Sequence, residues 1–292
     1  MRIILKKCLA IILALFINIP VMPMVFAQVP EGRNISIFRV DGNDVNLVRE
    51  PGGRAINPRA GHRLAEGNIL STGRDTQVYL LIDQASIFKM DESTSVLLGS
   101  ARHLVSMTVQ SGSALVEVTE QSPSHSMETR VGNVGLVVRG TIYIVSRLDS
   151  DAAIITMLSG SGEVAMPGED GAMHHIYLPA GLMMWVYDVY EDAHAAVEDT
   201  YRISAIDVNE LNLFELTEII NRQEYLIDIG VATAEMIEEA REIVEELRGD
   251  QIGEQVSLDN ADDEVVWIFL PEDEPSDNDC PICVREEEII II

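Results

Sequence analysis

The stretch Val134 to Val145, VGLVVRGTIYIV, decides how the fold of this chain is interpreted. It is rich in β-branched residues on both sides of the triplet Arg139-Gly140-Thr141, so it predicts strand structure with one interruption. A guanidinium within a buried strand is costly unless it is paired, and a glycine in a strand marks a bulge or a close backbone approach. We therefore expect Arg139, Gly140 and Thr141 to be a structural signature, with Arg139 capping carbonyls at a bend and Thr141 supporting the turn. A ligand-binding Arg139 is the alternative.

The same kind of sequence surrounds this stretch from residue 34 to residue 190. Short apolar runs are separated by Gly, Asp, Asn and Pro, and Val105 to Val109 alternates between apolar and polar residues. Alternation is typical of half-buried strands, and the turn signals recur about every ten residues. We predict a mainly β domain over residues 34–190.

A weak internal repeat bears on the architecture of that domain. Gln110 to Val116 and Leu158 to Val164 both place Ser-Gly-Ser after an apolar run and before a valine. Repeated short strands with glycine at their corners fit a twisted, solenoid-like stack, and a β sandwich predicts nearly the same pattern. Both architectures therefore remain open.

Residues 205–249 predict a small helical hairpin. Asp207 and Glu210 have the spacing of a capping box, Thr233 is a second candidate N-cap, and Gly249 is a candidate helix end. Apolar residues follow each cap at helical spacing. We expect the hairpin to pack on the β domain; an amphipathic pair that docks a partner is the alternative.

The two ends of the chain have distinct compositions. Residues 1–27 combine three basic residues, an apolar run from Cys8 to Ile19 and a small-residue site ending at Ala27, which predicts a signal peptide. Nothing later is apolar enough to span a bilayer, so we expect an extracytoplasmic chain, periplasmic or secreted, with no stable membrane span after cleavage; an uncleaved signal that serves as an anchor is the alternative. Residues 250–292 predict an acidic, partly disordered tail in which Val265 to Leu270 is the apolar exception.

The net charge of −28 limits the classes of partner. From Gln28 to Tyr190 there are 18 acids and 12 bases; from Glu191 to Ile292 there are 30 acids and 5 bases. Lys89 is the only lysine after residue 27. Such a surface repels phosphate backbones and anionic lipids, so we expect no nucleic-acid partner.

The motifs that could carry chemistry do not assemble a site. Cys280 and Cys283 form a CxxC without the further ligands of a zinc site, so a local disulfide is the favoured interpretation. His174 and His175 are neighbours on a predicted strand and therefore point to opposite faces, which is poor geometry for one metal. The sequence contains no recognisable combination of an acid, a base and a nucleophile that would form a catalytic site. We expect no metal, no cofactor and no enzymatic activity.

Four segments together resemble the FecR-domain family. They are Gly61 to Gly73, Val78 to Ser86, Val131 to Val145 with the Arg-Gly-Thr triplet, and Pro179-Ala180-Gly181. Asn68 and Gln84-Ala85 depart from the family pattern. The resemblance implies a twisted, solenoid-like β domain outside the cytoplasm. In one branch of the family this domain follows a transmembrane helix and a cytoplasmic anti-sigma segment.

Only seven residues precede the apolar run here, so we do not expect a direct anti-sigma role. The chain is therefore interpreted as a non-enzymatic protein-interaction or signal-sensing module of the cell envelope. Its expected partner is an envelope or extracellular protein. The alternative is a module that binds envelope glycan or calcium.

Overall fold

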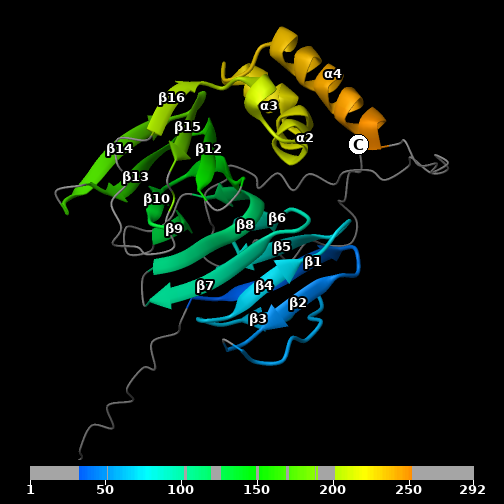
Figure 1. Cartoon of the computed structure of the whole chain (residues 1–292), viewed down its shortest axis with the longest axis vertical. Coiled ribbons are helices and arrows are strands. Elements are labelled where there is room, and N and C mark those ends of the chain that lie inside the picture. Colours follow the sequence, from blue (N-terminus) through cyan, green and yellow to red (C-terminus); the bar gives the residue numbers. More distant parts are fainter. Residues whose placement is uncertain are drawn as a thin grey trace, which may run out of the picture. The chain divides into compact units, whose positions relative to one another are not determined.

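The computed structural model describes residues 33–50, 52–101, 104–119, 126–148, 151–168, 171–187, 189 and 201–251. These residues form two connected β sheets followed by helices (Figure 1). The predicted mainly β fold with a small helical part is confirmed. Strands and helices belong to one compact unit that begins at Gly32.

Sheet A contains nine strands. In spatial order these are β3 (Arg63–Leu64), β1 (Ile35–Asp41), β5 (Gln77–Ile82), β6 (Ser86–Met90), β8 (Leu104–Val118), β11 (Thr141–Arg147), β12 (Ala152–Ser159), β15 (Leu182–Tyr187) and β16 (Tyr201–Ala205).

Sheet B contains eight strands and shares β8 with sheet A. In spatial order these are β2 (Val45–Val48), β4 (Ile69–Thr72), β7 (Ser95–Ala101), β8, β9 (Ser126–Val131), β10 (Val134–Val138), β13 (Ser161–Pro167) and β14 (Met173–Pro179). All pairs are antiparallel except β8 with β9.

One apolar core lies between the two sheets. It contains alternate residues of strands from both sheets, among them the fully buried Leu80, Phe88 and Tyr143 of sheet A and Leu70 and Met107 of sheet B. This arrangement is the sandwich-like form of the two predicted architectures.

A second core lies between the outer face of sheet A and the helices. Leu115, Ile144 and Ile154 belong to it from the sheet, and Phe214 and Ile219 from the helical part. The middle strands of sheet A are therefore buried on both faces, which explains why their sequences are nearly continuous apolar runs.

The helical part has more elements than the predicted hairpin. It contains a 3-10 turn η1 (Val208–Glu210) and three α-helices, α2 (Leu213–Asn221), α3 (Gln223–Asp228) and α4 (Ala234–Gln251). Thr233 caps α4 as predicted, because its Oγ1 accepts a hydrogen bond from the Met236 backbone N–H at 3.1 Å. Gly249 does not end α4, which runs on to Gln251. None of the helices in the described ranges is long and apolar enough to cross a membrane.

The signal peptide predicted for residues 1–27 and the tail beyond Gln251 lie outside the described residues. The same holds for Cys280 and Cys283.

Candidate functional site

The Arg-Gly-Thr triplet lies at a corner between the sheets and not inside one buried strand. The stretch Val134 to Val145 forms two strands, β10 in sheet B and β11 in sheet A, and residues 139–140 join them. Arg139 lies at this bend with an exposed side chain, so its guanidinium is not within a buried strand. The physical reason is that the chain turns out of sheet B just after Val138, which leaves the arginine on the outside of the bend.

Three corners have the same construction, which we call the corner motif. The triplets are Arg74-Asp75-Thr76, Glu92-Ser93-Thr94 and Arg139-Gly140-Thr141, and each joins a strand of one sheet to a strand of the other. The middle residue has a positive φ of 52°, 52° or 62°. The buried threonine hydroxyl lies 3.1 to 3.2 Å from the carbonyl oxygen two residues before it. The threonine thereby provides a hydrogen-bond donor to a carbonyl at the bend.

Each threonine of the corner motif lies against a glycine of another turn or strand. A methyl group added at Gly42, Gly112 or Gly160 would come within 2.4, 2.4 or 2.9 Å of the respective threonine Oγ1. The Oγ1 atoms of Thr94 and Thr141 also lie 3.1 and 2.9 Å from the carbonyl oxygens that follow these glycines, those of Ser113 and Ser161, so the single hydroxyl proton is shared between two carbonyls. The two Ser-Gly-Ser segments seen in the sequence are therefore both glycine corners that pass from one sheet to the other.

Helix α2 is attached to sheet A through its N-cap. Asn212 and Glu215 form a capping box, in which each side chain accepts a hydrogen bond from the backbone N–H of the other at 3.0 and 2.9 Å. The Asn212 amide also donates to the hydroxyls of Ser113 on β8 and Ser146 on β11, at 3.1 and 3.2 Å. The sequence placed the capping box at Asp207 and Glu210; Asp207 instead caps the 3-10 turn η1.

Glu215 is a fully buried carboxyl at this contact. Burial raises its pKa to about 7, although the Asn212 backbone N–H and the Ser146 hydroxyl both act to lower it. Its Oε1 has no hydrogen-bond partner among the described residues. A buried carboxylate with an unpaired oxygen is costly, so the neutral acid is favoured here.

A second attachment of α2 is ionic. The Lys89 ammonium of β6 lies 2.6 Å from Glu218 Oε1, and Arg222 Nη1 lies 2.5 Å from Glu218 Oε2. The Phe214 ring also faces the Lys89 ammonium, at 5.5 Å. Burial alone lowers the pKa of Lys89, but the charge and hydrogen bond of Glu218, with a smaller effect of Tyr79, raise it above its ordinary value. Lys89, the only lysine after residue 27, therefore stabilises the packing of α2 on sheet A.

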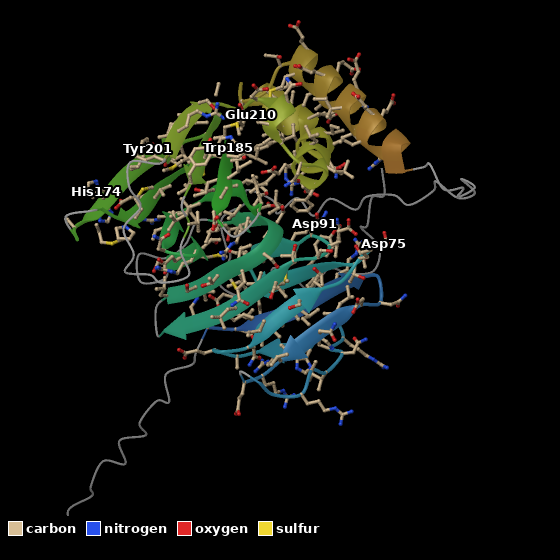
Figure 2. The ribbon with its side chains drawn as sticks, viewed as in Figure 1. Asp75, Asp91, His174, Trp185, Tyr201 and Glu210 are labelled. Atoms are coloured by element: carbon tan, nitrogen blue, oxygen red, sulfur yellow. The ribbon has the colours of Figure 1, made fainter. Side chains whose placement is uncertain are left out.

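The strands β14 and β16 are the final strands of sheets B and A. β14 pairs with β13 and β16 with β15, and no other described strand pairs with their outer edges. Figure 2 shows His174 of β14 and Tyr201 of β16 in this part of the molecule. We call this region, made of β14 and β16, the open end.

The core-facing residues of β16 are exposed to solvent. Tyr201 and Ile203 lie opposite Val186 and Met184 of β15, both of which are fully buried in the core between the sheets. Directly opposite residues share a face of the sheet, so Tyr201 and Ile203 also lie on the core-facing side. Their exposed fractions are nevertheless 42% and 37%. An apolar surface of this kind, next to a free backbone edge, fits the addition of another strand.

The opposite face of β16 is attached to the body of the protein. The Arg202 guanidinium is paired with Glu210 and lies over the Trp185 ring, 5.7 Å from its centroid. Trp185 donates its indole N–H to the same carboxylate at 2.7 Å (Figure 2). These contacts fix the edge strand in place while leaving its core-facing side chains open.

The described residues contain no group of three or more His, Cys, Asp or Glu side chains that could hold a metal ion. His174 and His175 lie on opposite faces of β14, and His175 Nδ1 is 2.5 Å from Glu163 Oε1 on β13.

No family model and no curated protein sequence matches the chain. Two solved structures that are similar are crystal structures of candidate anti-sigma factors from Parabacteroides distasonis ATCC 8503, at 1.65 Å and 2.50 Å resolution. The first is 14% identical, with a TM-score of 0.39, and the match covers 55% of this chain and 74% of that chain. The second is 12% identical, with a TM-score of 0.32, and the match covers 62% and 65%. Values this low do not establish membership of a family.

Proposed function

We propose that this protein is exported and acts as a non-enzymatic protein-interaction module in signal sensing at the cell envelope. The observation that supports this most directly is the open end, where a sheet edge that no described strand pairs with adjoins the exposed, core-facing Tyr201 and Ile203. A free edge of this kind offers backbone donors and acceptors to an extended polypeptide.

Two features of the sequence support the location and the role. The n-region, apolar run and small-residue site of residues 1–27 have the order of a signal peptide. The FecR-domain resemblance of Gly61 to Gly73 and Val131 to Val145 implies a domain that works outside the cytoplasm.

In-cell photo-crosslinking combined with fractionation tests this function. A photoreactive amino acid replaces Tyr201 in one strain and Leu247 in another; both side chains are exposed, and Leu247 lies on α4. We expect the chain in the extracytoplasmic fraction and a discrete crosslinked protein at position 201 that is absent at position 247. Retention of the chain in the cytoplasm, or equal crosslinking at the two positions, would refute the proposal.

A further inference from the structure

We propose that β16 binds an extended, cationic segment of a partner protein, which adds to the free edge of sheet A as a further strand. This inference rests on the proposed interaction function and specifies its partner. It follows from three properties of the open end: which edge is unprotected, which side chains are left open, and the sign of the charge.

β16 is less protected against strand addition than β14. Proteins blunt free edges with prolines and charged side chains. β14 ends in Pro179, and it carries the polar His174 and His175, of which His175 contacts Glu163 of β13. The only charged residue of β16 is Arg202, and its guanidinium is already paired with Glu210 and stacked on Trp185.

The side chains of β16 set the pattern of the incoming strand. Tyr201, Ile203 and Ala205 share the core-facing side, since they lie opposite Val186, Met184 and Leu182 of β15. A strand laid beside them would bury Tyr201 and Ile203 with its own alternate apolar residues, and its remaining residues would face the other way. β16 is five residues long, so about five residues of the partner can pair with it.

The net charge of the chain indicates which kind of polypeptide segment can bind beside β16. With a net charge of −28, two copies of this chain repel each other. The chain's own segment 252–292 carries 13 acids and one arginine, so it is repelled as well. A segment that carries lysine or arginine between its apolar residues is instead attracted, and charge of the opposite sign raises both the association rate and the specificity.

Fluorescence anisotropy with the full chain and synthetic peptides tests the inference. The probe is the labelled hexapeptide Lys-Val-Lys-Ile-Lys-Val. One comparison peptide has glutamate in place of each lysine, and another has proline in place of isoleucine. We expect saturable binding of the lysine peptide that weakens with added salt, and at least about ten-fold weaker binding of both comparison peptides.

Two substitutions with the same charge change locate the binding site. Ile203→Lys places a cation on the core-facing side of β16, and Ile229→Lys places one beyond α3 at a residue of similar exposure, 42% against 37%. We expect Ile203→Lys to weaken peptide binding at least about five-fold, from the lost apolar burial alone, and Ile229→Lys to weaken it less than about two-fold. Circular dichroism spectra that match the unaltered chain show that both variants are folded.

Other outcomes would overturn the inference. Equal affinity of the lysine and glutamate peptides, or an Ile203→Lys variant that binds like Ile229→Lys, contradicts a cationic strand on β16. Tighter peptide binding after removal of residues 252–292 would identify the chain's own tail as the occupant. A dimer that Ile203→Lys dissociates would identify a second copy. A crosslinked partner at position 201 without any peptide binding would refute this inference while leaving the proposed function intact.

Discussion

Glu215→Gln should stabilise the protein at pH 8 and change its stability little at pH 5. Burial raises the pKa of Glu215 from its ordinary value of 4.5 to about 7 in the folded chain. Between these two values the folded chain holds a proton that the unfolded chain has released. The stabilisation by the neutral acid is therefore complete below pH 4.5 and is lost as the pH rises to 7.

The size of the effect follows from the two pKa values. A pKa difference of one corresponds to about 1.4 kcal/mol, so an ionised Glu215 lowers the free energy of unfolding above pH 7 by about 3 kcal/mol. Glutamine keeps an oxygen to accept the Asn212 backbone N–H and has no charge to bury. We therefore expect Glu215→Gln to raise the free energy of unfolding by up to about 3 kcal/mol at pH 8 and by less than about 1 kcal/mol at pH 5.

Urea unfolding followed by far-UV circular dichroism at pH 5 and pH 8 measures this difference. Glu245→Gln, at an exposed position of α4, is the matched control and should change stability by less than about 0.5 kcal/mol at both pH values. The reasoning fails if Glu215→Gln destabilises the protein equally at the two pH values, because Glu215 would then be a stabilising carboxylate.

Three further predictions concern the corner motif and the ionic attachment of α2, and urea unfolding measures each of them. Gly160→Ala should cost about 1–3 kcal/mol more than Gly181→Ala: both glycines have a positive φ, but only at Gly160 would the new methyl group meet the opposite corner, 2.5 Å from a carbonyl oxygen. Equal losses of stability in the two variants would contradict this, because they would show that the backbone at the corner shifts to accommodate the methyl group. Glu218→Leu should cost about 3 kcal/mol or more, since it leaves the buried Lys89 ammonium without a carboxylate and removes one of the two carboxylates beside Arg222, and Lys89→Met should cost less because Arg222 remains on Glu218; the reverse order would contradict the assigned network. Arg139→Ala should cost about 1 kcal/mol or less, since the side chain is exposed, and a loss of several kcal/mol would show that its guanidinium supports the corner.

The fold class could be predicted from the sequence because its signal is local. Alternation in Val105 to Val109 and glycine at turns are properties of a few neighbouring residues, and both predict strands. The Ser-Gly-Ser segments around Gly112 and Gly160 correctly indicated corners. The choice between solenoid and sandwich was not local, because it depends on which strands pair, and similar runs occur throughout the domain.

The burial of particular residues could be predicted less well. The exposure of the Arg139 side chain could not be predicted, because the sequence does not show that the chain leaves sheet B after Val138. The true capping box, Asn212 with Glu215, has the same spacing as the one expected at Asp207. It lies only five residues further along, and the contact with Ser113 and Ser146 distinguishes the two boxes.

The open end and the ionic attachment could not have been found from the sequence. Lys89 was conspicuous as an isolated lysine, but its partner Glu218 lies 129 positions away and is one of many acids. Tyr201 and Ile203 were not singled out, because their importance depends on β16 being the last strand of sheet A. Whether a strand lies at an edge depends on the assembled sheet, and no pattern of neighbouring residues indicates it.

Hydrogen–deuterium exchange on the full chain, with and without the lysine peptide, tests the central claim that the protein works by adding a strand at its open end. The account predicts that the peptide slows exchange of the backbone amides of residues 201–205, while the amides of α4 exchange at unchanged rates. Peptide binding that leaves exchange in residues 201–205 unaltered, or that protects a different face, would contradict it.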